Sequence, residues 1–405
     1  MNLEDNLRDR LESVETPPSQ VDVEMLVDAG RRRIFRRRSV EAVGGVALVA
    51  AVLLAVPWVL NAAKAGPVVP PPLGDSAAPT TPPAPTGPAS PTPSSSPTTR
   101  ANRCAMEKLP VPDGMKDVTP AAVDPTGRYI VGNDVVGQNF RAVLWTDGRP
   151  RALPVVGESV QATAVNASGV VVGLVAEGNE NQAFRYHDGT LTRLRTPAEQ
   201  WHIYPTPAIN AAGDIVINAK PSGGSAGEGS IVLLWKAGTT TATRLPLPAE
   251  ADVLDIGDDG TLVGAVYENG AATDAYVWDQ QGKARKLERP AGVEAAAAHA
   301  ISGDWATGGL WRDGNGFTAL WNIRTGALTD LKSADVGSAV NASGWVVNAL
   351  GRLVRDGADP ELVAPDGQSG KAWDVAGTGL VVGQAIVERQ DGLGDDNLGP
   401  RVWHC

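Results

Sequence analysis

Cysteine and histidine are scarce in this chain. Its 405 residues include two cysteines and four histidines. So few thiols exclude a multi-cysteine zinc site, and four scattered imidazoles argue against a metal site built from histidine. We therefore expect neither a metal ion nor a cofactor.

Aromatic residues and basic charge are also limited. Aromatics make up 5% of the chain, yet 11 tryptophans outnumber the 4 phenylalanines and 5 tyrosines together. This skew predicts a tryptophan placed once in each unit of a repeat. The net charge is −11, and the acidic excess falls entirely after residue 100. An acidic domain is unsuited to nucleic acid, so we expect no nucleic-acid partner.

Residues 39–63 are predicted to form one transmembrane helix. Residues 42–60 are nineteen residues without a charge, and at about 1.5 Å each they span roughly 28 Å, enough to cross a bilayer core. Six arginines lie just before them, within 31–38, so the positive-inside rule places residues 1–38 in the cytoplasm. The alternative is a signal peptide cleaved near residues 63–65, but the long N-terminal region and long apolar stretch favour an uncleaved anchor.

The flanks of this helix predict two further segments. Leu3, Leu7 and Leu11 recur at helical spacing, which gives a short amphipathic helix that can dock a cytoplasmic protein; a plainly solvated helix is the alternative. Residues 64–100 are rich in Pro, Ser and Thr and cannot bury a core, so they are predicted to be a disordered, extended stalk.

Residues 101–405 repeat a double motif. Its first half is an apolar residue, Asn or Asp, two small or polar residues, Gly and a β-branched run. It begins at residues 123, 165, 209, 256, 301, 340 and 375, with the copy at 301 degenerate. The second half ends in an aromatic residue and a turn, as in RAVLWTDG at 141 and QAFRYHDG at 182. Spacings of about 35 to 47 residues are typical of propeller blades.

This repeat predicts an all-β fold, a seven-bladed β-propeller of four-stranded antiparallel blades. Each unit gives an inner strand, an Asn-x-x-Gly turn, a Val-rich strand, a variable loop, an aromatic strand, a tight turn and an outer strand. The repeated Trp or Tyr supplies apolar bulk between blades. A β-sandwich also contains many short strands, but it would not repeat one double motif at near-constant spacing.

The two ends of this domain complement each other. The seventh unit stops after its aromatic strand at Trp403, while residues 107–110 match the outer strand of the first unit at 151–154. We therefore predict that an N-terminal strand closes the last blade. In this alignment Cys104 and Cys405 fall where other units have their Asp-Gly turn, which predicts a disulfide that closes the ring. Two unpaired thiols are the alternative.

The double motif resembles that of the HAF family of extracellular repeat propellers, A-I-N-x-x-G followed by H-A-F-x-W-x-x-G. The Ala position is held by Ala142, Ala183, Ala275 and Ala319. The His position is taken instead by Arg141, Gln182, Asp274 and Thr318. The resemblance covers nearly all of 104–405. It implies a surface-exposed propeller and little about activity.

Binding is expected on one face of the ring. The Asn-x-x-Gly and Asp-Gly turns share a face, whereas the connections near 219–230, 309–317 and 388–399 are long and irregular and share the other. We expect a ligand on this variable-loop face or at the mouth of the central channel. Trp201, His202 and Tyr204 open the third blade, where they can stack on a glycan or hold a peptide; packing between blades is the alternative.

Two other groups are candidates with simpler alternatives. Asp395 and Asp396, together with Asp391, lie in a Gly-rich loop that can bind Ca²⁺ or be merely a solvated acidic loop. His299 and Trp373 fall on predicted innermost strands, where they either line the channel or belong to the core.

These features predict a single-pass membrane protein with an external propeller. The leading hypothesis is a non-catalytic module that binds a protein or glycan. A transmembrane sensor whose tail holds a cytoplasmic regulator is the alternative. A hydrolase is a weaker third, because neither paired carboxylates nor a Ser/His/Asp set stands out by spacing.

Overall fold

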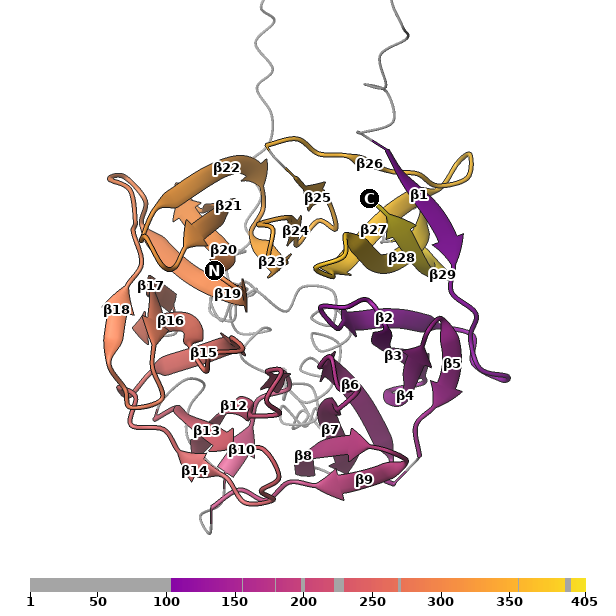
Figure 1. Ribbon diagram of the computed structural model, residues 1–405, viewed down its shortest axis with the longest axis horizontal. Helices are drawn as coiled ribbons and strands as arrows, with labels where there is room; N and C mark the ends of the chain where they lie inside the picture. Colours follow the sequence, from indigo (N-terminus) through magenta and orange to yellow (C-terminus); the bar gives the residue numbers. More distant parts are fainter. Residues whose placement is uncertain are drawn as a thin grey trace, which may run out of the picture.

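The computed structural model describes residues 103–405, apart from residues 155, 179, 198–200, 222–228, 269–270, 356 and 390–394. The predicted cytoplasmic tail, transmembrane helix and stalk lie outside the described residues. Among the described residues, no helix is both long and apolar enough to span a bilayer. Seven β-sheets surround a central axis (Figure 1). The prediction of an all-β, seven-bladed propeller is confirmed.

Four of the blades match the predicted unit, with four antiparallel strands in chain order from the axis outward. Blade 1 consists of β2 (Val118–Val123), β3 (Tyr129–Val136), β4 (Asn139–Thr146) and β5 (Arg149–Ala152). Blade 2 consists of β6 (Ser159–Val165), β7 (Val171–Glu177), β8 (Glu180–His187) and β9 (Thr190–Arg193). Blade 4 consists of β15 (Ala251–Ile256), β16 (Leu262–Glu268), β17 (Ala271–Trp278) and β18 (Ala284–Lys286). Blade 5 consists of β19 (Ala295–Ser302), β20 (Trp305–Arg312), β21 (Asn315–Asn322) and β22 (Leu328–Ala334).

Blades 3 and 6 depart from this unit. In blade 3 the inner strand is split, because β10 (Trp201–Ile203) and β11 (Ala208–Ile209) both pair with β12. Its remaining strands are β12 (Ile215–Pro221), β13 (Ile231–Trp235) and β14 (Thr243–Arg244). Blade 6 has three strands among the described residues: β23 (Gly337–Val340), β24 (Val346–Asn348) and β25 (Leu353–Val354).

Among the described residues, blade 6 thus has one strand fewer than the predicted unit. The strand that follows, β26 (Glu361–Leu362), crosses to the seventh sheet and pairs in parallel with β1 (Arg103–Lys108). An ion pair of 2.9 Å between Arg103 and Glu361 holds it there, and Leu362 packs against the apolar cluster around Cys104. These contacts draw the segment away from blade 6.

The ring closes in blade 7 as predicted. Its strands β27 (Ser369–Val375), β28 (Leu380–Glu388) and β29 (Asp395–His404) are followed on the outside by β1 from the other end of the domain. β1 is antiparallel to β29, with Ala105 opposite His404 and Lys108 opposite Arg401. Cys104 and Cys405 form a disulfide across 301 residues of sequence, with their Cα atoms 4.5 Å apart.

In three blades the Asn of the repeated turn links the blade to the next. The side-chain oxygen of Asn166 accepts hydrogen bonds from the N–H groups of Ser168 and Val170 in its own turn. Its amide nitrogen donates to the carbonyl of Asn210, the matching residue of blade 3, at 3.0 Å. Asn210 repeats this toward blade 4, and Asn341 repeats it toward blade 7. The turn sequence thus fixes the contact between neighbouring blades as well as the hairpin.

The repeated tryptophans also have a polar role. Trp145, Trp235, Trp321 and Trp403 are buried between blades, as expected. Each indole N–H donates to a carbonyl in the segment that enters the blade, with distances of 2.6 to 2.9 Å. The aromatic residue therefore fills the space between blades and holds the crossover between them.

The register of the strand pairs corrects two of the predictions made from the sequence. Thr318 lies opposite Gly309, just as Ala142 lies opposite Asn133, so Thr318 and not Ala319 holds the Ala position of blade 5. The connection near 309–317 is also not long, because β20 and β21 continue to Arg312 and Asn315 and leave two residues between them.

Candidate functional site

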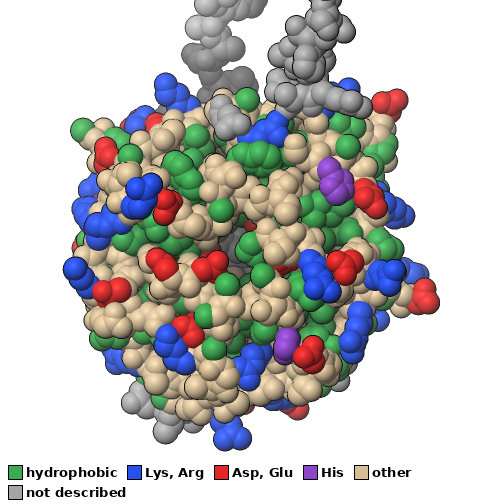
Figure 2. Space-filling view, in the orientation of Figure 1, with side chains coloured by type: hydrophobic (Ala, Val, Ile, Leu, Met, Phe, Trp, Pro, Cys, Tyr) green, Lys and Arg blue, Asp and Glu red, His purple; other side chains and the backbone are tan. Residues whose placement is uncertain are grey.

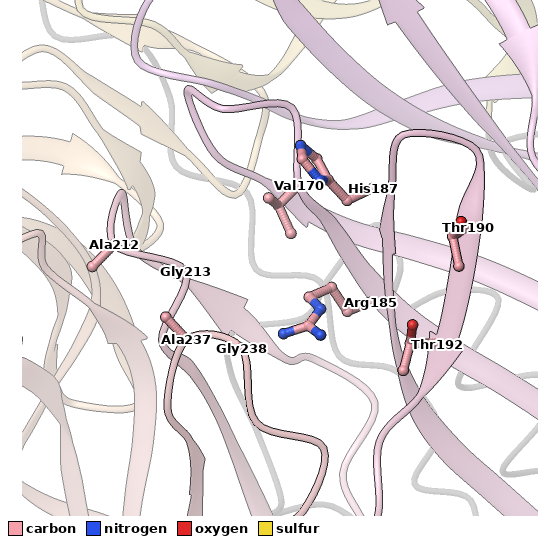
Figure 3. Close-up of a pocket in the computed structure, with 9 residues that line it drawn as sticks. All are labelled: Val170, Arg185, His187, Thr190, Thr192, Ala212, Gly213, Ala237 and Gly238. Carbon is pink, nitrogen blue, oxygen red and sulfur yellow. The ribbon is translucent and has the colours of Figure 1, made fainter.

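A pocket of about 260 Å³ lies between blades 2 and 3, on the face formed by the repeated turns. Figure 3 shows its two walls, the β8–β9 hairpin on one side and two turns of blade 3 on the other. Its lining residues are Val170, Arg185, His187, Thr190, Thr192, Ala212, Gly213, Ala237 and Gly238. The prediction placed binding on the opposite face.

The polar wall comes from alternating positions on the hairpin of blade 2. Arg185 pairs with Thr192, and His187 pairs with Thr190, across β8 and β9. Because residues two apart in a strand point to the same side of a sheet, these four side chains share one face. They bring a guanidinium, an imidazole and two hydroxyl groups to the pocket.

Arg185 occupies a position that is apolar in the rest of the ring. It immediately precedes Tyr186, the aromatic residue of its blade. At the same position, five other blades place a buried aliphatic side chain, between 4% and 8% exposed: Leu144, Leu234, Val277, Leu320 and Val402. Arg185 is half-buried, and its side chain forms no ion pair or hydrogen bond with the part of the chain that the structure describes. Blade 2 therefore replaces a core residue with an uncompensated cation.

The facing wall consists of small residues. Ala212 and Gly213 belong to the Asn-x-x-Gly turn of blade 3, and Gly213 has a φ of 90°, which favours glycine. Ala237 and Gly238 form the second turn, where Ala237 replaces the aspartate that blades 1 and 2 carry at Asp147 and Asp188. The substitution removes a carboxylate from the wall opposite Arg185.

The nearest buried carboxylate of that wall is already satisfied. Asp214 accepts hydrogen bonds from the ammonium group of Lys236 at 2.8 Å and from the N–H of Ala237 at 3.0 Å. Burial alone would raise the pKa of Asp214, but these hydrogen bonds and the charge of Lys236 lower it below its ordinary value. Asp214 is thus neutralised by Lys236 and does not compensate Arg185.

The predicted residues of blade 3 are placed along its inner edge. Trp201 is half-buried and packs against the apolar cluster of blades 2 and 3, with its indole nitrogen buried and unpartnered among the described residues. His202 is exposed opposite Lys220 on β12. The hydroxyl group of Tyr204 lies 3.2 Å from that of Ser230. The structure does not bring these three side chains together in a pocket.

His299 and Trp373 occupy equivalent positions. Each is the extra residue at a β-bulge in an innermost strand, β19 and β27 respectively. His299 is buried, and its Nδ1 lies 2.8 Å from the carbonyl oxygen of Gly337. Burial lowers the pKa of His299 to about 4, so the ring is neutral at physiological pH. Trp373 is half-buried beneath the ammonium group of Lys371, 5.6 Å from the ring centre.

Asp395 and Asp396 were predicted in a loop, but they begin strand β29, and they face basic groups of their own blade. Asp395 lies 3.8 Å from the ammonium group of Lys371, and Asp396 lies 4.0 Å from the guanidinium group of Arg389. Asp391 lies outside the described residues. Within the described chain, no three His, Cys, Asp or Glu side chains gather in an arrangement able to hold a metal ion.

Three carboxylates of the innermost strands, Asp252, Asp255 and Asp374, have raised pKa values, and the last two serve the fold. Burial raises the pKa of Asp255 to about 7 and that of Asp374 to about 6. In each, one oxygen accepts the N–H of the following residue, and the other accepts an N–H of the next blade, at Ile301 or Val123. These carboxylates join the inner strands of neighbouring blades. Acidic side chains are visible around the central opening in Figure 2.

The sequence contained a signal for the pocket that our prediction did not use. RAVLW and QAFRY are the same segment of two consecutive units, and they differ at the residue before the aromatic, Leu144 against Arg185. Comparing the units position by position, rather than by their shared pattern, would have singled out Arg185. The role of the facing wall depends on which blades are neighbours and could not be read from one unit.

Comparison with known proteins adds no family. No family model matches the chain, and no curated protein matches it, so the resemblance to the HAF repeats is not confirmed. Among solved structures, TolB from Acinetobacter baumannii has a TM-score of 0.36 and 9% identity over 56% of this chain, which covers 53% of that protein. An oligogalacturonate lyase from Vibrio parahaemolyticus has a TM-score of 0.42 and 10% identity over 73% of this chain and 85% of the lyase. A gluconolactonase from Xanthomonas campestris has a TM-score of 0.38 and 14% identity over 76% of this chain and 92% of the lactonase.

Proposed function

We propose that this protein is a membrane-anchored, extracytoplasmic propeller that binds a ligand without catalysing a reaction. The observation that carries the proposal is the pocket between blades 2 and 3. In blade 2, Arg185 stands where five other blades have an aliphatic core residue, and the side chains that face the cavity can hold a ligand. Polar groups that converge in a concavity are the usual mark of a binding site.

The chemistry of the described residues supports binding rather than hydrolysis. Glycosidases need two carboxylates with oxygens free to act on substrate. Of the three inner-strand carboxylates with raised pKa, Asp255 and Asp374 use both oxygens to accept backbone N–H groups. Among the described residues this leaves Asp252 as the single member of the three with an unpartnered oxygen, and one carboxylate does not make the pair that a glycosidase needs. The pocket itself offers donors and a cation.

Localisation is part of the proposal and has separate support. Disulfides persist in oxidising compartments, and the Cys104–Cys405 bond closes the ring. The apolar stretch within 39–63 and the arginines before it support an orientation with the propeller in such a compartment.

Protease added to intact cells tests the topology. We expect fragments of the propeller to be released while residues 1–38 stay protected until the cells are lysed. Protection of the propeller in intact cells would overturn the proposed location.

Cross-linking and pull-down from intact cells then tests the function. The full chain is compared with a variant that lacks residues 1–30. Partners captured by both forms support binding by the propeller. Partners captured by the full chain alone would instead make the protein a sensor that holds a cytoplasmic regulator.

A further inference from the structure

We propose that the pocket between blades 2 and 3 binds the phosphate group of a phosphate ester. This inference rests on the proposed binding function and names the chemistry of its ligand. It begins from the positive charge of the Arg185 guanidinium group. The side chain is half-buried and has no partner in the described part of the chain.

The charges around the pocket leave Arg185 uncompensated. Lys236 and Asp214 neutralise each other at 2.8 Å. Asp188 is 87% exposed and lies 3.5 Å from the imidazole of His187, pointing toward solvent. An unpaired charge that has lost part of its hydration is costly, and an entering anion would offset that cost.

The donors favour phosphate over carboxylate. Figure 3 shows the guanidinium group of Arg185 between the two walls, with the hydroxyl groups of Thr190 and Thr192 on the strand beside it. The planar fork of an arginine can bind two oxygens of one anion, and each hydroxyl can donate to another. A tetrahedral phosphate has oxygens for donors on several sides, whereas a carboxylate has two.

The space around these donors fits an ester. A volume of about 260 Å³ exceeds the needs of a phosphate group and lies just below the range of drug-sized pockets. The facing wall has no side chain larger than a methyl group at Ala212, Gly213, Ala237 and Gly238. The remaining volume can hold the small organic group to which the phosphate is attached.

The repeat provides a clean substitution. Because the equivalent position holds Leu144, Leu234 or Leu320 in other blades, Arg185→Leu removes the charge and restores the pattern of the repeat. We expect this variant to fold with at least the thermal stability of the original protein. Arg244→Leu is the matched control, since Arg244 is an exposed arginine on β14 of the neighbouring blade and does not line the pocket.

The test is phosphorus NMR with the full chain in phosphate-free buffer and non-ionic detergent. Glycerol 3-phosphate and inorganic phosphate are the probes, and line broadening reports binding. We expect the original protein and Arg244→Leu to bind glycerol 3-phosphate equally. Loss of the charge-assisted bonds should weaken binding on the order of 10- to 100-fold in Arg185→Leu. Thr192→Val should give a smaller loss in the same direction, and glycerol 3-phosphate should bind more tightly than inorganic phosphate.

Three results would overturn the inference. One is unchanged binding in Arg185→Leu, and another is an equal loss in Arg244→Leu, which would mean general attraction by positive charge. The third is displacement of glycerol 3-phosphate by glucuronate, a carboxylate, at the same concentration as displacement by inorganic phosphate, which would mean that the pocket does not prefer phosphate. Capture of the same partners from cells by Arg185→Leu would overturn this site and leave the binding function standing, whereas capture of none by the original protein would overturn that function itself.

Discussion

Breaking the bond between Cys104 and Cys405 should lower the free energy of unfolding of the propeller by about 3 to 5 kcal/mol. The bond spans 301 residues of sequence, and the loop-entropy model gives about 5 to 6 kcal/mol for a loop of that length. Measured values for single disulfides are smaller, commonly about 2 to 5 kcal/mol. The folded ring should survive, because β1 still pairs with β29 and Leu109 still donates to the carbonyl of Pro400. The loss therefore comes mainly from the freedom that the unfolded chain regains.

The assay is urea unfolding followed by tryptophan fluorescence. The double variant Cys104→Ala/Cys405→Ala is preferred to serine, because Cys104 is fully buried and a hydroxyl group there would add a second cost. Reductant should lower the unfolding midpoint of the original protein and leave the double variant unchanged. A loss of unfolding free energy below about 1 kcal/mol would refute the reasoning, since it would mean that a cross-link between the two ends of the propeller scarcely restricts the unfolded chain.

Two other predictions concern side chains inside the ring. Trp235→Phe should destabilise the fold by about 1 to 2 kcal/mol more than Trp278→Phe. Both indoles are buried, but the N–H of Trp235 donates to a carbonyl at 2.9 Å, while that of Trp278 has no partner among the described residues. Equal losses of stability in thermal or urea unfolding would contradict the prediction. Burial raises the pKa of Asp252 to about 6, above that of the unfolded chain, so the folded state binds the proton more tightly and loses stability as the pH rises from about 4 to about 6. Asp252→Asn should therefore match the original protein in urea unfolding at pH 4 and exceed it at pH 8, and parallel pH profiles would exclude a buried ionised Asp252.

The architecture was predictable because each of its determinants is local and repeated. The turn at Asn166 and the aromatic position at Trp145 recur in the sequence, and together they indicate where the hairpins lie and how far apart the blades are. The last unit lacked an outer strand of its own, and residues 104–110 matched that strand. A repeat shows its period in one sequence even when each unit is degenerate.

The features that escaped prediction depend on contacts between units. The pairing of β26 with blade 7 depends on Arg103 and Cys104, which lie some 260 residues away in sequence. The residues of blade 6 alone do not predict this pairing. The position of Thr318 is an exception, because the sequence already decides it: Thr318 stands three residues before Trp321, as Ala142 stands three residues before Trp145, and the register with β20 agrees. The pocket likewise needs Arg185 from one blade and small turns from the next.

The position of the disulfide also decides how the domain bears mechanical load. Cys104 is the second residue of β1, so tension on the chain ahead of Arg103 meets the pairing of Arg103 with Glu361 on β26 and then the covalent bond to Cys405. The force passes directly into β29, and the hydrogen bonds between β1 and β29 are not peeled apart one at a time. A pull on the N-terminal side of the propeller is therefore resisted by a covalent bond where β1 meets β29.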